Sequence, residues 1–306
     1  MKKPVMKMKQ IKTLLLLAVA ALMTACGTTS HVPVTGRKQN LLVSNEQVLS
    51  LSSQQYQEYM KTATASTNAE QTAMVKRVGQ KLATAVEEYL KSNGLAEEVK
   101  QYAWEFNLVQ NKEVNAFCMP GGKIVVYEGI LPVTQDEASL AIVLGHEIAH
   151  AVAKHSAERL SNAYKQQVGM QVIGSVAQAA GASSSLQQLG SAVLGVGAQA
   201  WSSGFSRSQE SEADHIGIIF AAMAGYDPEV AISFWQRMAA AGSGKTSIFS
   251  DHPSDEKRIK QIQEWMPEAK TYYKPVQVTA AQTKTTTTAS TKKTKAKAKT
   301  TTKKKK

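Results

Sequence analysis

Neither end of this chain can contribute to a hydrophobic core, and this limits where a fold can form. From residue 274 onward there are eleven lysines, no acidic residue and long threonine runs, a composition that predicts a disordered tail over 274–306. At the other end, five lysines in "MKKPVMKMKQIK" precede the apolar run "LLLLAVAALM", which is too short to span a bilayer and is typical of a signal peptide. We therefore expect a signal over 1–25, a tether over 26–43 and one folded domain over 44–273.

The segment "LMTAC" at the end of the signal resembles a bacterial lipobox, in which the cysteine, here Cys26, is lipidated and becomes the mature N-terminus. A plain secretory signal cleaved nearby is the alternative. Since neither Gly27 nor Thr28 is an aspartate of the kind that retains lipoproteins at an inner membrane, we expect an outer-membrane lipid anchor facing the periplasm. Cys118 then has no disulfide partner, and we interpret it as a small buried apolar residue.

The charge of the chain is concentrated in its ends. Without the eleven lysines of the tail and the five of the signal, the formal net charge falls from +12 to −4. Nucleic-acid binding by the folded domain therefore has no support. The tail could contact anionic lipid, cell wall or lipopolysaccharide, or it could be solvated without a specific partner.

Helical patterns dominate the folded domain, with one exception. "SNEQ" over 44–47 has capping-box spacing, and an apolar stripe at helical spacing then ends at Gly94. Its members are Met74, Val75, Val78, Leu82, Val86 and Leu90. Between residues 102 and 127, apolar and polar residues alternate, and "NAFCM" and "KIVVY" flank the turn "PGG", which predicts two or three short strands with a hairpin. We expect a mainly α fold with a small β-sheet, of the α+β class.

A long helix is predicted to follow the strands. Thr134 and Glu137 have capping-box spacing, and the helix should run through "VLGHEIAHAVAKHSAERL" to about Tyr164. Residues 166–204, rich in Ala, Gly, Ser and Gln, are interpreted as helices packed on the core or as a mobile lid. Three further helices are predicted over "SQESEADHIGIIFAAMAG", "DPEVAISFWQRMAA" and "SDEKRIKQIQEW".

The central helix carries the candidate chemistry. On an α-helix His146 and His150 differ by about 40° around the axis and about 6 Å along it, so both imidazoles can reach one cation. Glu147 points about 100° away from His146, where a base could take a proton from water held at the metal. His155 falls about 180° from His146 on the same helix, and we interpret it as a bystander that packs or faces solvent.

A catalytic zinc ion needs a third protein ligand and an open position. In "QESEADHIG", Glu210 and Asp214 are four residues apart on one predicted helical face. Glu210 can supply the third ligand, and Asp214 can accept the outer N–H of a zinc-binding histidine. Taken alone, "ESEAD" would be read as a solvated acidic helix start.

Together these residues resemble those of the gluzincin-type zinc metalloproteases, the family of HtpX, the CaaX-prenyl endopeptidase and the Oma-type proteases, and most closely its bacterial periplasmic lipoprotein members of the BepA/LoiP kind. "VPVTGRKQNLLVS", "NAFCMPGGKIVVYEGIL" and "DHPSDEKRI" look like further motifs of that family. The resemblance implies a minimal peptidase domain with its HExxH helix behind an edge strand, and one Zn²⁺ ion per chain. It also implies that His146, His150 and Glu210 are zinc ligands and Glu147 is the base.

Further roles follow from the same resemblance. Asn115 and Ala116 would lie on the edge strand that pairs with the extended backbone of polypeptide substrates. The His-Pro setting of His252 implies a role at the site, either as donor to the developing oxyanion or as a fourth zinc ligand that keeps the enzyme latent. Arg258 would accompany it as a partner for Asp214 or for substrate.

The resemblance implies a zinc endopeptidase of the bacterial cell envelope that degrades damaged or misassembled, unfolded envelope proteins. A periplasmic chaperone or assembly factor that binds without cutting is an alternative, although such a protein has no need of Glu147. The Lys/Thr-rich tail alone would also fit a structural lipoprotein of the cell surface.

Overall fold

The structure, a computed structural model, describes residues 28–166, 205–241 and 256–274. Contacts divide the chain into two units, Met1–Tyr273 and Lys274–Lys306, and the described residues before Lys274 all belong to the first. The predicted signal, nearly all of the predicted lid and the predicted tail lie outside the described residues. Within the described ranges, no helix is both long and apolar enough to cross a bilayer.

The described chain begins with a hairpin and two helices. Strands β1 (Thr28–His31) and β2 (Lys38–Leu41) pair antiparallel. Helix α2 (Asn45–Thr62) starts with both hydrogen bonds of the capping box predicted at "SNEQ". Helix α3 (Ala69–Ser92) buries the predicted apolar stripe and is followed at Gly94 by a residue with φ of +76°. The short helix α4 (Ala96–Val99) leads into the sheet.

Three short strands form the sheet predicted between residues 102 and 127. Strand β5 (Lys123–Tyr127) lies in the middle, parallel to β3 (Glu105–Val109) and antiparallel to β4 (Ala116–Met119). The predicted hairpin connects β4 to β5 through Gly121 and Gly122, both with positive φ. Among the described strands β4 pairs with β5 alone, so its other side is an edge of the sheet.

The start of the central helix differs from the prediction. After a 3-10 turn (η1, Glu128–Ile130), the short helix α5 (Leu131–Thr134) contains Thr134 as its last residue, and its hydroxyl donates to a carbonyl of α5. The cap of α6 (Glu137–Val152) is instead Asp136, whose side chain accepts from the N–H of Ser139 at 2.7 Å. The capping box predicted from Thr134 was therefore wrong, because Thr134 already belongs to the preceding turn.

The end of the central helix also differs. Helix α6 stops at Val152 instead of continuing to about Tyr164, and a second helix runs over residues 155–166. Between them the chain turns at Ala153 and Lys154, and Lys154 has a φ of +55°, the left-handed region that an α-helix cannot contain. This turn changes the direction of every side chain that follows it.

Three helices complete the described fold: α9 (Arg207–Met223), α10 (Val230–Ala241) and α12 (Glu256–Tyr272). Helix α9 crosses α6 at a point where the two backbones touch. A Cβ atom added at Gly145 would lie 2.6 Å from the carbonyl oxygen of Gly217. One added at Gly217 would lie 2.7 Å from the backbone nitrogen of His146 on α6. Only glycine at both positions allows this approach.

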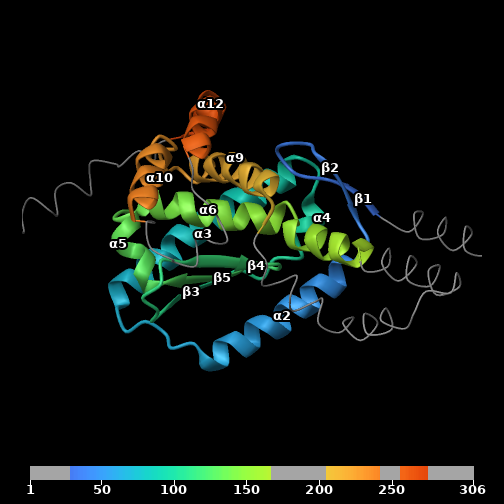
Figure 1. The fold of residues 1–306 in the computed structure, drawn as a ribbon, viewed down its shortest axis with the longest axis horizontal. Coiled ribbons are helices and arrows are strands. Elements are labelled where there is room, and N and C mark those ends of the chain that lie inside the picture. The colour runs from blue at the N-terminus through green and yellow to red at the C-terminus, as the bar shows by residue number, and fades with distance from the viewer. Residues whose placement is uncertain (1–27, 167–204, 242–255, 275–306) are drawn as a thin grey trace, which may run out of the picture. The chain divides into compact units, whose positions relative to one another are not determined.

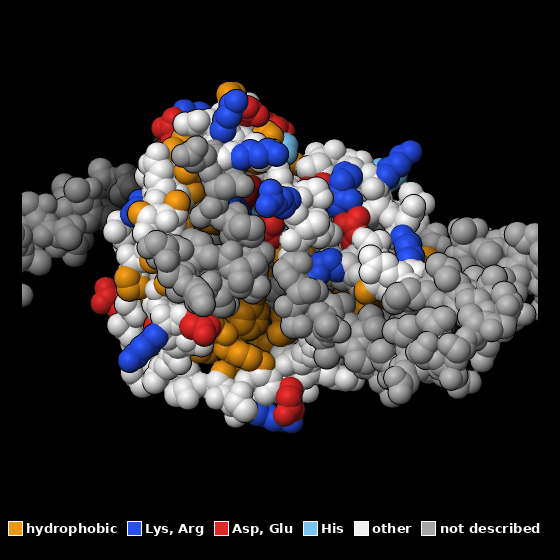
Figure 2. Space-filling view, viewed as in Figure 1, with side chains coloured by type: hydrophobic (Ala, Val, Ile, Leu, Met, Phe, Trp, Pro, Cys, Tyr) orange, Lys and Arg blue, Asp and Glu red, His pale blue; other side chains and the backbone are white. Residues whose placement is uncertain are grey.

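The elements stack in layers, with α9 above α6, the sheet below α6 and α2 beneath the sheet (Figure 1). Alternation along the strands explains the layers: Phe106 and Ile124 join the main core with α3 and α6, whereas Val125 joins a second cluster with Tyr56 of α2. On the face shown in Figure 2, charges of both signs are interspersed and hydrophobic side chains are exposed between α6 and α2. The predicted α+β class is confirmed.

Candidate metal centre

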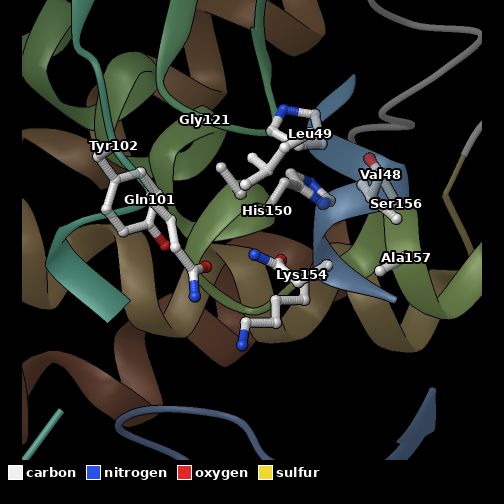
Figure 3. A pocket seen from close by; sticks show the side chains of 12 residues that line it. Val48, Leu49, Gln101, Tyr102, Gly121, His150, Lys154, Ser156 and Ala157 are labelled. Carbon is white, nitrogen blue, oxygen red and sulfur yellow. The ribbon is translucent and has the colours of Figure 1, made fainter. Parts of the chain in front are cut away.

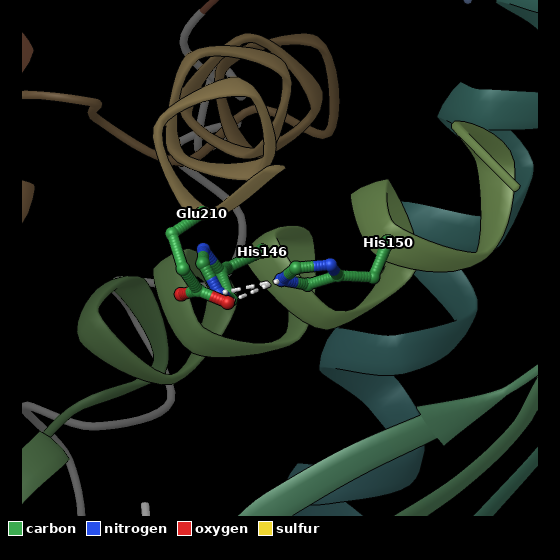
Figure 4. A group of neighbouring side chains, drawn as sticks. All are labelled: His146, His150 and Glu210. Carbon is green, nitrogen blue, oxygen red and sulfur yellow. Dashed lines mark hydrogen bonds and ion pairs between the residues drawn. The ribbon is translucent and has the colours of Figure 1, made fainter. Parts of the chain in front are cut away.

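His146 and His150 of α6 face Glu210 of α9 in the interior of the protein (Figure 4). The Nε2 atoms of the two histidines are 3.1 Å apart, and each lies 3.4 Å from an oxygen of Glu210. The exposed fraction of each residue is 5% or less. Three donor groups from two helices thus converge on one point, within reach of a single cation.

The crossing of α6 and α9 explains this convergence. Glu210, Asp214 and Gly217 are separated by four and three residues, so they share one face of α9. Gly217 contacts the backbone of α6 at His146. The carboxylates of Glu210 and Asp214, on the same face of α9, are therefore placed next to the histidines. The helix crossing therefore positions the donors, and the close approach of the backbones holds the distance between them.

The outer nitrogen of His146 is held by a carboxylate. Its Nδ1 lies 2.8 Å from Oδ1 of Asp214. Arg258 of α12 donates to the same oxygen at 2.6 Å, and its Nε lies 2.6 Å from the other oxygen of Asp214. The guanidinium also lies over the ring of Trp235, 3.5 Å from its centroid. Asp214 and Arg258 were both predicted to lie at the site, and the structure brings both to His146.

These neighbours determine the charge of the histidines. Burial alone would lower the pKa of His146, but hydrogen bonds to Asp214 and Glu210 outweigh it and raise the pKa to about 9. Burial lowers the pKa of His150 well below its ordinary value, and the nearby imidazole of His146 lowers it further. Without a cation, His146 is therefore an imidazolium that faces Asp214 with Nδ1 and Glu210 with Nε2, while His150 is neutral.

The structure corrects the interpretation of His155 as a bystander. Its side chain is fully buried, with Nδ1 2.9 Å from Nδ1 of His150 and Nε2 3.0 Å from Oε2 of Glu212. The prediction failed because it continued one straight helix through Lys154, whereas the left-handed turn returns His155 toward α6. Burial lowers the pKa of His155, so it is neutral. Sequence reasoning also missed Glu212, although it lies within "ESEAD".

Glu147 is buried beside the cluster, on the side of α6 that faces β4. Its exposed fraction is 3%. Burial raises the pKa of Cys118 on β4 well above its ordinary value, and the charge of Glu147 adds to this effect. Cys118 is partly buried and not fully buried as predicted, and it lies on the same strand as Ala116, which is 1% exposed. Asn115 directly precedes that strand and accepts the N–H of Ala116 on its side chain at 2.8 Å.

A small cavity lies on the outer side of His150 (Figure 3). It has a volume of about 20 Å³ and is lined by α2 at Val48, by Tyr102 and by Lys154 at the turn after α6. This volume suffices for one water molecule but not for a peptide side chain. Two residues named from the sequence, Cys26 and His252, lie outside the described residues.

The fold and this cluster define a class: an HExxH helix crossed by a second helix that supplies a glutamate is the arrangement of gluzincin-type peptidases. A model of peptidase family M48 matches residues 69–266, more than half of the chain. The chain belongs to peptidase family M48.

Named relatives come from mitochondria and bacteria. The chain is 42% identical to "Mitochondrial metalloendopeptidase OMA1" of Schizosaccharomyces pombe over 54% of its length and 48% of that protein. It is 30% identical to the human "Metalloendopeptidase OMA1, mitochondrial" over 78% of its length and 46% of that protein. With the "Beta-barrel assembly-enhancing protease" of Escherichia coli (strain K12) it shares 29% identity over 56% of its length and 37% of that protein. The chain thus spans about half or less of the length of these relatives.

Proposed function

We propose that this chain is a zinc-dependent endopeptidase. The observation that carries the proposal is the buried convergence of His146, His150 and Glu210, with Glu147 beside them. Membership of family M48 and similarity to proteins named metalloendopeptidases support it. We assign the peptidase domain to residues 44–273, as the sequence analysis did.

The donor groups fit zinc in number, chemistry and spacing. Two histidines and one glutamate are a known ligand set of catalytic zinc. Ligand atoms about 2.0–2.1 Å from a tetrahedral zinc ion lie about 3.3 Å from one another. Here the two Nε2 atoms are 3.1 Å apart, and Glu210 has one oxygen 3.4 Å from each of them, Oε2 toward His146 and Oε1 toward His150. The proton that two carboxylates hold on His146 indicates that the cluster favours positive charge, which a cation would also supply.

Glu147 is proposed as the general base and acid. A zinc ion bound by the three donors would supply Lewis acidity, which polarises a peptide carbonyl and makes water a stronger acid. The carboxylate of Glu147 then accepts the proton of the attacking water and passes it to the leaving amine nitrogen. Its burial directly after His146 on α6 supports this role, because the proton must move from water to the amine within the site.

The open edge of β4 is proposed to bind the substrate as an added strand. The carbonyl of Asn115 accepts from the N–H of Tyr127 on β5, so the alternation of an antiparallel pair directs the backbone of Ala116 and Cys118 to the open edge. An extended peptide that pairs there would run beside Glu147. The N–H of Ala116, which now donates to the side chain of Asn115, would donate to the substrate instead.

The remaining residues are proposed to support the reaction. Asp214 fixes the ring of His146, and Arg258 holds the carboxylate of Asp214 in place. His252, in the segment just before α12, is proposed to act at the site as oxyanion donor or as a fourth ligand of a latent state. The substitution His252→Ala separates these roles, because it lowers activity in the first case and raises it in the second.

We further propose that Cys26 is lipidated and anchors the protein to the outer membrane on its periplasmic side. The lipobox-like "LMTAC" supports this, and the E. coli relative named for β-barrel assembly is consistent with it. Damaged or misassembled envelope proteins are the proposed substrates. The name of the same relative also favours an assembly role in addition to proteolysis, whereas the buried Glu147 argues against binding without cleavage.

The substitution Glu147→Gln tests the proposed mechanism. The purified protein should keep its zinc and its melting temperature but lose about 10²–10⁴-fold in the rate of cleaving an unfolded, fluorescently labelled test protein, because an amide cannot accept the proton. Glu137→Gln, in the partly exposed first turn of the same helix, is the matched control and should cleave normally. Cleavage by Glu147→Gln at nearly the wild-type rate would disprove the mechanism, and a zinc-loaded wild type that only binds the test protein would favour a chaperone.

A further inference from the structure

The left-handed turn at Lys154 creates a hydrogen-bonded chain behind His150. Lys154 is held there by an ion pair of its amine with Glu98 at 2.7 Å. The turn places Nδ1 of His155 against Nδ1 of His150. Nε2 of His155 then forms a hydrogen bond with the carboxylate of Glu212 on α9. Two imidazoles and a carboxylate therefore lie in series, and all three residues are buried.

The chemistry of the carboxylate fixes the direction of every proton in this series. Glu212 can only accept, so Nε2 of His155 carries the hydrogen and its Nδ1 is an acceptor. His150 must then donate from its own Nδ1, because two acceptors cannot share a 2.9 Å hydrogen bond. The remaining nitrogen of His150, Nε2, keeps its lone pair, and this is the atom that faces Glu210 and His146.

The outer end of the series is the turn between β1 and β2, within the motif "VPVTGRKQNLLVS". Thr35 donates to Oε1 of Glu212 at 2.6 Å and the Nε of Arg37 donates to Oε2 at 2.8 Å. The other two nitrogens of Arg37 bind both oxygens of Glu158, at 2.7 and 2.9 Å, on the helix that carries His155. Arg37 therefore links α9, through Glu212, to the helix that carries His155, through Glu158.

We propose that His155, Glu212 and Arg37 are positioning residues that fix the tautomer of His150 and aim its Nε2 at the metal. The proposal rests on the proposed zinc site and extends it to the N-terminal hairpin. Outer groups of this kind orient metal-binding histidines and typically contribute about 10–100-fold to metal affinity. The effect of a substitution should decrease along the series from His155 to Arg37, because each further group acts through the one before it.

The experiment compares the full chain with His155→Phe, a ring of similar size without nitrogen atoms. Zinc affinity, measured by competition with a chromophoric chelator, should fall about 10–100-fold in His155→Phe. His31→Ala, which removes an exposed imidazole of β1, is the matched control and should bind zinc as the wild type does. If His155→Phe does not fold, Arg37→Ala keeps the test intact, since its side chain is 37% exposed, and a several-fold loss is expected.

A second measurement separates positioning from packing. In metal-free protein with ¹⁵N-labelled histidine, nitrogen shifts report which ring nitrogen carries hydrogen. The wild type should show His150 protonated at Nδ1 alone, and the variants should show both tautomers. Wild-type zinc affinity in His155→Phe or Arg37→Ala together with an unchanged tautomer would overturn the proposal. A wild type that binds no zinc would refute the proposed function. The metal-free spectra would still show whether His155, Glu212 and Arg37 fix the tautomer of His150.

Discussion

His146 and His150 lie one turn apart on α6, yet their outer nitrogens are supported in different ways. The Nδ1 of His146 meets the carboxylate of Asp214 directly, whereas the Nδ1 of His150 meets the neutral imidazole of His155 and reaches a carboxylate only through it. The pKa of His146 is consequently raised to about 9, while burial lowers that of His150 well below its ordinary value and the hydrogen bond to Glu210 offsets this only in part. One predicted ligand is therefore made more basic and the other is only oriented.

The two supports also come from opposite ends of the chain. Arg258 of α12 stands behind Asp214 and is 5% exposed, whereas Arg37 of the N-terminal hairpin stands behind Glu212 with a side chain that is 37% exposed. Helix α9 carries both carboxylates. Helix α9 is therefore the element that supports both histidines. The support of His146 is the more deeply buried of the two, so its disruption should cost more free energy of unfolding.

The largest expected effect is the loss of both supports at once through Gly217→Ala. The added Cβ would meet backbone atoms of α6 at 2.7 and 2.9 Å, which cannot move aside as a flexible side chain can. We expect the free energy of unfolding, measured by urea denaturation, to fall by about 4 kcal/mol and zinc binding to weaken. Gly94→Ala, with a φ of +76° and no atom within 4 Å of the new Cβ, is the control and should cost only about 1 kcal/mol. Equal losses in the two variants would contradict the role of the helix crossing.

A smaller effect is expected when only the support of His146 is removed. Asp214→Asn removes the nearer of the two carboxylates that pair with the buried guanidinium of Arg258, so the free energy of unfolding should fall by about 3 kcal/mol. Zinc affinity should fall by about 10–100-fold, as judged by chelator competition. Asp136→Asn serves as the control, because asparagine caps a helix as well as aspartate does. A stability equal to the wild type would show that Asp214 and Arg258 are not coupled.

The smallest effect should follow Lys154→Gly. Glycine adopts a φ of +55° without strain, and the ion pair that is lost with Glu98 is partly exposed, so the free energy of unfolding should change by less than about 1 kcal/mol. Zinc affinity should be unchanged, because the backbone turn places His155 and the lysine side chain does not. A loss of affinity comparable to that of His155→Phe would show that the lysine itself has a role in the site.

The parts of the fold that could be predicted are those set by local sequence. The capping box at Ser44, the stripe on α3 and the hairpin after "NAFCM" depend on residues close together in the chain. The same holds for the spacing of His146 and His150 on one helix. Helix geometry alone places these two side chains together, whatever the rest of the chain does.

The parts that could not be predicted depend on one backbone turn and on distant partners. A lysine with positive φ has no sequence signature, and the turn at Lys154 decided the direction of His155. Thr134 was misassigned because a short helix ends there, two residues before the true cap, Asp136. The pairing of Arg37 with Glu212 joins residues 175 positions apart, and no local pattern connects them.

The central claim is that His146, His150 and Glu210 together hold one zinc ion. The direct measurement is the zinc content of the purified full chain after dialysis, by mass spectrometry of the metal, for the wild type and Glu210→Ala. The account predicts about one zinc per wild-type chain and most of it lost in Glu210→Ala, because two histidines alone bind zinc weakly. A wild type without zinc, or a Glu210→Ala variant that retains the full content, would contradict it.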